Sequence, residues 1–353
     1  MKNALIATNG VYTSDTAKTA HGLVRGTTRY QIKGIVDEKF YGGDAGVLLD
    51  GQKRDIPIFE TLELALKKDK DIDYLIIGVA TKGGLLPSNL KALIVNAISQ
   101  GISIVNGLHY CLSDDKELSD LAFRFKVRLH DIRKPKSFSD LHFWNGSIKT
   151  VKCPIVAVLG TDCKMGKRTT AKIMTDVSSE AGIDAQMIYT GQTGYLQGFK
   201  HGFIFDATLN DFIAGELEKA VVDCYNETNP DVIFIEGQSA LRNPNGPCGS
   251  EFIISANAKF VVLQHSPDRI YFDNDPALGY KIPSLRSEID LINSFGGRVV
   301  AISLKSEKLN THTDHAEVYE VSEKLKIPVI NPLNSDHKTI LSIVKKILAA
   351  YEN

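Results

Sequence analysis

The sequence predicts an α/β protein with two doubly wound parallel-sheet domains, which we place at residues 1–140 and 141–353. Three observations support this prediction. Short apolar runs alternate with helical patterns along the chain, which is typical of a parallel sheet covered by helices on both faces. A polar stretch over residues 132–151 interrupts the alternation once. The length of 353 residues suits two domains.

The first domain alternates strands and helices from its first residues onward. Its apolar runs lack polar–apolar alternation, which indicates strands buried on both faces of a sheet. Gly42-Gly43 marks a turn after the second strand. The predicted strands are 4–7, 32–36, 56–59, 74–79 and 102–105, and the predicted helices are 14–25, 62–68 and 90–99.

The second domain starts the same alternation again after the polar stretch. The predicted strands are 154–159, 185–189, 232–235, 260–263, 298–304 and 328–330. The predicted helices are 167–181, 211–225, 289–295, 317–325 and 338–351. Open α/β sheets bind ligands at the carboxyl ends of their strands, so the residues that follow each strand are the candidates for function.

The composition argues against some classes of binding partner. The net charge of −1 gives no general attraction to nucleic acid or to anionic membranes, so we expect neither partner. Five scattered cysteines without a Cys-x-x-Cys pair argue against a disulfide framework or a zinc ribbon, and they favour reduced thiols in the cytoplasm. The N-terminus turns polar too early for a signal peptide, and no apolar run reaches membrane-spanning length.

A phosphate-binding loop follows the first strand of the second domain. The strand runs into Gly160, and Gly166-Lys167 opens the next helix. Glycines let backbone N–H groups converge on an anion, the helix N-terminus adds its dipole, and the lysine adds a full charge. The residues expected to bind a phosphate-bearing cofactor are Gly160, Thr161, Asp162, Cys163, Gly166, Lys167, Arg168, Thr169 and Thr170.

Two features distinguish this loop from the common motif. Five residues separate its glycines instead of four, and Arg168 follows the lysine where serine or threonine is usual. That hydroxyl ligates Mg²⁺ in nucleotide hydrolases, and a guanidinium in its place would repel a cation in a partly desolvated site. We therefore predict that the loop holds phosphates without a metal ion. Cys163 either has a pKa lowered by the helix N-terminus or simply fills the turn.

Three residues are candidates for a catalytic base. Glu236 follows a strand and is the first choice, with a surface carboxylate as the alternative interpretation. His265 is a base, or a structural or orienting histidine. Asp206 is the third candidate.

The motifs of the second domain resemble those of a family long catalogued as a domain of unknown function, now associated with N-acetyltransferases of D-glutamate and other D-amino acids. A more distant resemblance, on the loop and on residues 233–237, is to dethiobiotin synthetase. One departure is that Ser239-Ala240-Leu241 stands where the family is expected to have Gly-Ser-Leu, which reduces backbone freedom. The matching segments are Gly160 to Cys163, Gly166 to Thr170, Gly191 to Gly194, Asp211-Phe212 and Glu236 to Gln238.

The resemblance implies a Rossmann-like N-terminal domain, a P-loop NTPase-like C-terminal domain and transfer of acetyl from acetyl-CoA to the amine of a D-amino acid, with D-glutamate as the expected substrate. A base would deprotonate the substrate ammonium, and a Gly191–Gly194 turn or a glutamine amide would stabilise the oxyanion. Arg242, Arg269 or Arg286 would clamp the substrate's acid side chain, unless these are surface charges. We also expect a homo-oligomer. The residues expected to bind the substrate are Gln192, Thr193, Gln238, Ser239 and Arg269.

Two other functions remain open at this point. A ligase or kinase that uses Mg-ATP, like dethiobiotin synthetase, would need Glu236 and Thr169 as metal ligands, and Arg168 argues against it. An NAD-dependent enzyme or binding module would use the first domain, where Asp37 ends the second strand. The turn that begins at Thr8 lacks Gly-x-Gly-x-x-Gly, however. If the first domain binds no dinucleotide, we expect it to cover the active-site cleft or to form an oligomer interface. Residues 106–109 would then contribute to a site at the domain junction.

Overall fold

The protein divides into two compact units, as a computed structural model describes them over residues 1–305, 316–334 and 337–352. The first unit contains Met1–Lys136 and also the later segment Gln192–Phe199. The second unit contains Ser137–Gly191 and the chain from Lys200 onward. The first unit therefore gains a segment that the sequence assigned to the second domain.

The first unit is built on a six-stranded sheet with the order β3-β2-β1-β4-β5-β6. Every pair in it is parallel, which confirms the predicted doubly wound class. The order reverses beside β1, as in Rossmann-like sheets. The strands are β1 (Lys2–Ala7), β2 (Tyr30–Val36), β3 (Ile58–Phe59), β4 (Tyr74–Ile77), β5 (Ser103–Asn106) and β6 (Leu129–Asp131).

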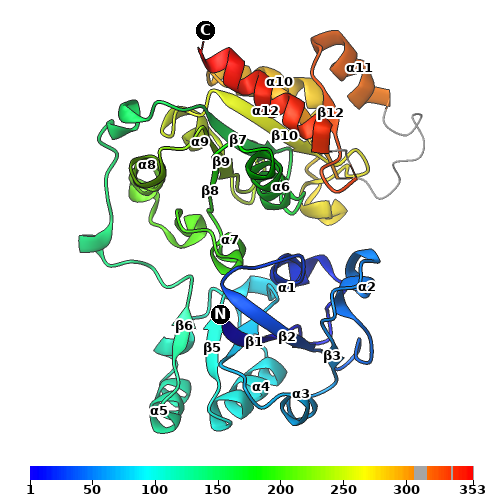
Figure 1. Ribbon diagram of the computed structural model, residues 1–353, viewed down its shortest axis with the longest axis vertical. Coiled ribbons are helices and arrows are strands. Elements are labelled where there is room, and N and C mark those ends of the chain that lie inside the picture. Colours follow the sequence, from blue (N-terminus) through cyan, green and yellow to red (C-terminus); the bar gives the residue numbers. More distant parts are fainter. Residues whose placement is uncertain (306–315, 335–336, 353) are drawn as a thin grey trace. The chain divides into compact units, whose positions relative to one another are not determined.

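The helices of the first unit include three that the sequence pattern did not predict: α2, α5 and α7. The short α2 begins where Asp44 accepts a hydrogen bond from the N–H of Val47 and ends at Gly51, whose φ is 77°. Six residues are too few to show a helical period. Figure 1 shows α7 beside α1, on the opposite side of this unit from α3 and α4. The helices are α1 (Lys18–Val24), α2 (Ala45–Asp50), α3 (Leu62–Lys68), α4 (Ser88–Ser99), α5 (Lys116–Phe125) and α7 (Gln192–Gln197).

The second unit is also built on a six-stranded parallel sheet, with the order β12-β11-β10-β7-β9-β8. Its first strand, β7, lies in the middle between β9 and β10, so the chain reverses its direction of winding beside β7. The strands are β7 (Ile155–Gly160), β8 (Ala185–Ile188), β9 (Val232–Glu236), β10 (Phe260–His265), β11 (Arg298–Leu304) and β12 (Val329–Ile330).

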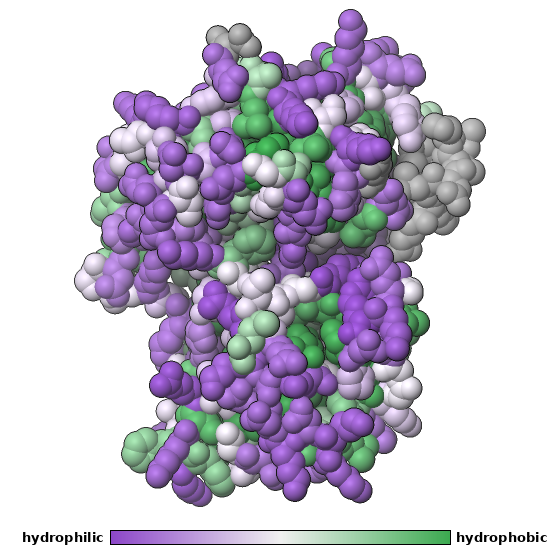
Figure 2. Space-filling view, viewed as in Figure 1, coloured by the Kyte–Doolittle hydropathy of each residue, from purple (hydrophilic) through white to green (hydrophobic). Residues whose placement is uncertain are grey.

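Helices cover this second sheet, and α6 packs against α12 (Figure 1). The helices are α6 (Lys167–Glu180), α8 (Asn210–Thr228), α9 (Ser250–Ile254), α10 (Leu285–Ser294), α11 (Ala316–Leu325) and α12 (His337–Glu352). No helix in the described ranges is long and apolar enough to cross a membrane. Figure 2 shows a mainly hydrophilic face, because the large apolar side chains lie in the two cores.

The polar stretch before β7 is fixed to α8 through buried carboxylates. Glu216 accepts hydrogen bonds from the backbone N–H and the Nδ1 of His142, and Glu218 accepts one from the N–H of Ile148. A Cβ on Gly215 would lie 1.9 Å from the carbonyl oxygen of His142, so only glycine admits this approach. The stretch is therefore a packed part of the second unit.

Candidate functional site

The candidate site lies at the carboxyl end of β7, where winding reverses and ligands of open α/β sheets bind. All six residues of β7 are buried, and the strand passes through Gly160 into the predicted loop. The loop ends at Gly166, whose φ of 101° is in the region that favours glycine. The structure thus confirms strand, loop and helix in the predicted order.

The N-terminus of α6 carries cations and no cap. Gly166 provides no side chain to accept a hydrogen bond from the first turn, which contains no acidic residue. Lys167 and Arg168 are the first two helical residues. Cations at a helix N-terminus oppose the helix dipole, and the first N–H groups of a helix have no intrahelical acceptor. This end of the helix is therefore built to receive an anion.

Lys167 folds back along the loop and is buried. Its Nζ donates to the carbonyl oxygens of Asp162 and Ser239, each at 2.7 Å. A Cβ on Gly160 would lie 3.2 Å from that Nζ, so the glycine makes room for the lysine. Burial lowers the pKa of the Lys167 ammonium, although nearby groups that include Asp162 and Glu236 oppose this shift.

Asp162, which was expected to contact the cofactor, instead binds other loops of the same unit. Its side chain is fully buried. Oδ1 accepts from Nδ2 of Asn243 at 2.8 Å, and Oδ2 accepts from Nη1 of Arg269 at 2.8 Å. The N–H of Asp273 also donates to Oδ2, at 2.9 Å. Arg269, expected to clamp the substrate, thus directs Nη1 to Asp162.

Cys163 fills the turn, which was the second of the two expectations for it. Its Sγ lies 3.3 Å from Oγ of Ser239 and 3.5 Å from Nδ2 of Asn243. Burial raises the pKa of the Cys163 thiol, so the expectation of a lowered pKa is wrong. Asp162, Cys163 and Asp273 lie close enough to share an ion. However, a guanidinium and two other donors already occupy both Asp162 oxygens.

His265 ends β10 directly beside the phosphate loop. Its Nδ1 and Oγ1 of Thr161 are 2.9 Å apart, so a loop hydroxyl orients the ring. One turn into α6, Oγ1 of Thr170 donates to Oε1 of Gln264 at 2.6 Å. Thr170 therefore ties α6 to β10. The structure brings His265 to the loop, as expected.

Glu236 ends β9 and is buried beside the same loop. Its Oε2 accepts from the N–H of Thr190 at 3.1 Å, and its carbonyl accepts from Oγ1 of Thr190 at 2.6 Å. Nε2 of Gln238 donates to that hydroxyl at 3.0 Å. A Cβ on Gly237 would lie 2.2 Å from the carbonyl oxygen of Val158, which excludes any larger residue there.

Ser239 stands where the resemblance led us to expect glycine, and its backbone has the conformation that glycine favours. Its φ is 34°, a positive value that side-chain-bearing residues rarely adopt. The serine carbonyl accepts from Lys167 and its hydroxyl contacts Cys163. The departure from the expected motif thus lies in contact with the phosphate loop.

The remaining predicted residues are more dispersed. Asp206 is exposed in a 3-10 turn, next to Phe205, whose N–H donates to the carbonyl of Thr190. Arg242 pairs with the buried Glu288 at 2.6 Å, and Arg286 pairs with Asp290 on the surface of α10. The structure shows these two arginines in structural ion pairs.

The expected glycine turn at residues 191–194 is wrong, because residues 192–194 form the first turn of α7 in the first unit. Oε1 of Gln192 accepts from Nη2 of Arg133 at 2.7 Å, and the hydroxyls of Thr193 and Thr19 are 3.0 Å apart. These side chains fasten α7 within the first unit. Asp37 is fully buried and accepts from Thr8 at 2.6 Å and from backbone N–H groups nearby, so its oxygens are used internally.

Sequence analysis did not select four residues that contact the loop or the predicted site residues beside it. One lies at the end of β10 and the others follow strands, but uncharged side chains and a lone aspartate give no specific signal. They are Thr190, Asn243, Gln264 and Asp273.

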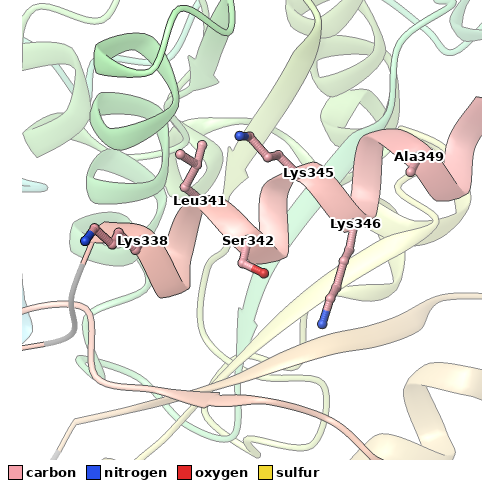
Figure 3. A pocket seen from close by; sticks show the side chains of 6 residues that line it. All are labelled: Lys338, Leu341, Ser342, Lys345, Lys346 and Ala349. Carbon is pink, nitrogen blue, oxygen red and sulfur yellow. The ribbon is translucent and has the colours of Figure 1, made fainter.

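A shallow depression on α12 is not part of this site. Figure 3 shows its lining side chains projecting from one helix, with no member of the phosphate loop among them. Three lysines and one serine are among the residues that line it. The lining residues are Lys338, Leu341, Ser342, Lys345, Lys346 and Ala349.

A parallel sheet whose central strand runs through a glycine- and lysine-containing loop into a helix defines the second unit as a P-loop domain, and the first as Rossmann-like. Comparison with known families agrees. Residues 142–341 match the P-loop domain of DUF1611, and residues 38–135 match its Rossmann-like domain, both described as domains of unknown function. The chain belongs to the DUF1611 family.

Three relatives illustrate the similarity. The chain is 29% identical over 265 residues to a D-glutamate N-acetyltransferase of Tritonibacter scottomollicae, covering 73% of this chain and 77% of the relative. It is 28% identical over 274 residues to a protein of the same name from a Pseudoalteromonas species, covering 76% and 80%. The crystal structure of a DUF1611 protein from Anabaena variabilis superposes with a TM-score of 0.86 at 26% identity, covering 99% and 100%.

Proposed function

We propose that this protein transfers an acetyl group from acetyl-CoA to the amino group of a D-amino acid, with D-glutamate as the first substrate to test. The observation that carries the proposal is the uncapped N-terminus of α6, where Lys167 and Arg168 occupy the first turn. The names of the two N-acetyltransferase relatives support the reaction class.

The loop suits the phosphates of coenzyme A. Coenzyme A carries a pyrophosphate and a ribose phosphate, and a helix N-terminus, whose first N–H groups have no intrahelical acceptor, binds such anions. Arg168 occupies the position of the hydroxyl that holds Mg²⁺ in nucleotide hydrolases. The hydroxyl of Thr170, two residues after Arg168, donates to Gln264. The guanidinium of Arg168 supplies positive charge that a metal ion would otherwise supply.

The chemical step needs a neutral amine. In our proposal His265 accepts a proton from the substrate ammonium, after which the amine nitrogen bonds to the thioester carbon. The carbon–sulfur bond then breaks and the nitrogen loses a second proton to solvent. The leaving thiolate takes up the proton that His265 carries, so one proton is released for each acetyl group transferred. Histidine is the side chain best suited to carry a proton near neutral pH, and the hydroxyl of Thr161 fixes its ring.

Glu236 has a different role in this scheme. Its carboxylate interacts with the Lys167 ammonium and accepts a hydrogen bond from the backbone of Thr190. It balances the charge of the lysine and holds the ends of β8 and β9 in position. Asp206, exposed in its turn, is the weaker candidate for the base.

Release of free thiol from acetyl-CoA, measured against a panel of D- and L-amino acids, tests the proposal. We expect turnover with D-glutamate that exceeds turnover with L-glutamate by at least tenfold. Titration calorimetry with acetyl-CoA and with Mg-ATP provides the second arm. Tight binding of Mg-ATP without binding of acetyl-CoA would overturn the proposal in favour of a ligase or kinase.

A further inference from the structure

Three successive carbonyl groups of the phosphate loop each accept a hydrogen bond from a different cation. The carbonyl of Asp162 accepts from Nζ of Lys167 at 2.7 Å. The carbonyl of Cys163 accepts from Nη1 of Arg269 at 2.6 Å, and the carbonyl of Lys164 accepts from Nζ of Lys305 at 3.3 Å. These cations come from α6, from the loop after β10 and from the residue that follows β11.

The position of these carbonyls determines where the loop's N–H groups point. In a planar trans peptide the C=O and the following N–H point in opposite directions. Because Arg269 and Lys305 hold the carbonyls of residues 163 and 164, the N–H groups of residues 164 and 165 point away from these two side chains. Lys164 has a φ of 55°, so the loop includes the left-handed turn on which concave N–H nests depend.

Asp162 fixes the central cation of this set. Its Oδ2 accepts from the same Nη1 of Arg269 that donates to the carbonyl of Cys163, and its Oδ1 accepts from Asn243. Asp162 is fully buried, and the Arg269 side chain is only 8% exposed. Asn243 belongs to the loop after β9, so the carboxylate joins three loops of the unit.

We infer that Asp162, Arg269 and Lys305 are positioning residues that hold the phosphate loop in its anion-binding shape from its carbonyl side. Asp162 acts through Arg269 and does not contact the phosphate. This inference rests on the proposed function for the identity of the natural ligand, acetyl-CoA. It applies equally to any phosphate-bearing ligand of the loop, and inorganic pyrophosphate serves as an independent probe.

The variant D162N separates positioning from simple electrostatics. Removing a negative charge near the site would by itself tighten the binding of an anion. If Asp162 acts by holding Arg269, D162N instead weakens the binding of acetyl-CoA and of pyrophosphate at least tenfold in titration calorimetry. R269Q weakens both to a similar degree, and the double variant adds little to either single change because both act through one contact.

The thiol of Cys163 gives a readout that needs no ligand. Alkylation by iodoacetamide, followed by peptide mass spectrometry, should be at least tenfold faster at Cys163 in D162N and R269Q. The fully buried Cys224 reports on global unfolding in the same samples. E288Q is the matched control, since it weakens the Glu288–Arg242 pair outside the loop. We expect it to leave ligand affinities and Cys163 labelling unchanged.

The outcomes are distinct. Wild-type affinity for pyrophosphate and wild-type labelling of Cys163 in both D162N and R269Q would overturn the inference, as would tighter binding by D162N. If the wild-type protein binds pyrophosphate but not acetyl-CoA, the proposed function fails, and the pyrophosphate and labelling results still decide the role of Asp162. If D162N does not fold, R269Q and K305M carry the same test.

Discussion

Nζ of Lys167 donates to the carbonyl of Ser239 at 2.7 Å, and Ser239 presents that carbonyl with a φ of 34°. A left-handed conformation costs a residue with a side chain about 1–2 kcal/mol, which glycine avoids. The strained residue therefore provides one of the two carbonyl acceptors of Lys167. Strain at such a place is a common property of functional sites.

Replacing Ser239 tests this strain. We expect S239G to raise the free energy of unfolding by about 0.5–1 kcal/mol, because the relief of strain exceeds the entropy that glycine adds to the unfolded chain. S239V should lower it by at least about 1 kcal/mol, since a β-branched side chain tolerates positive φ poorly. Urea denaturation compares the three proteins. Equal stability of S239G and S239V would contradict this account.

The buried ammonium of Lys167 makes stability depend on pH. Its native pKa lies below the usual 10.5, so the unfolded chain binds more protons at this position between the two values. The lysine therefore costs stability most below its native pKa, and the cost decreases as the pH rises toward 10.5. Urea midpoints of wild type and K167M should converge as the pH is raised. A difference between the two urea midpoints that grows as the pH is raised would contradict this prediction.

K167M should also abolish the binding of acetyl-CoA, with at least a hundredfold loss of affinity in calorimetry. The reason is that the lysine supplies the central positive charge of the phosphate loop. K172M is the matched control. Lys172 lies on the same helix and forms a partly buried pair with Asp176. It should bind acetyl-CoA as the wild type does. Unchanged affinity in K167M would refute the assignment of the loop.

Substitution by alanine should have different effects on stability at two glycines of the site. In G237A the new Cβ would lie 2.2 Å from the backbone oxygen of Val158, so we expect a loss of about 3 kcal/mol of stability. In G160A the nearest atoms belong to the flexible end of Lys167, and stability should change by about 1 kcal/mol or less. Acetyl-CoA affinity of G160A should nevertheless fall about tenfold, because the lysine is displaced. Thermal unfolding and calorimetry measure the two effects separately.

The contact between Thr161 and His265 predicts a change in turnover. T161V removes the hydroxyl at 2.9 Å from the ring, which should lower kcat about tenfold, equivalent to about 1.4 kcal/mol. T161S keeps the hydroxyl and should restore most of the activity. H265N should lower kcat much further, with the KM for acetyl-CoA little changed. If E236Q abolished turnover while H265N retained it, the base would be Glu236.

Much of the fold was predictable because parallel sheets give strong local signals. Buried strands such as β7 and β9 appear as unbroken apolar runs, and the loop before α6 has a specific spacing. Short elements were harder. The six-residue α7 begins with a glycine-rich segment typical of a turn, and nothing local indicates that it belongs to the first unit.

The contacts of individual side chains were less predictable than the positions of these residues in the fold. Asp162 and Arg269 lie 107 residues apart, and a sequence cannot show that their charges meet. Each was therefore assigned to a ligand, although the structure pairs them with each other. The same holds for Gln192 and Arg133, which meet within the first unit. Spacing identifies backbone geometry well, whereas long-range pairing requires the folded chain.

The path of α7 has a consequence for how this protein can be divided or recombined. The polypeptide passes from one unit to the other three times, after residues 136, 191 and 199. A fragment ending at residue 136 would lack Leu196, which is fully buried in the first core, so a hydrophobic hole would remain. A single cut cannot separate the two units as complete modules, and gene shuffling at one junction would damage both. The path of the chain through α7 therefore favours inheritance of the two units together.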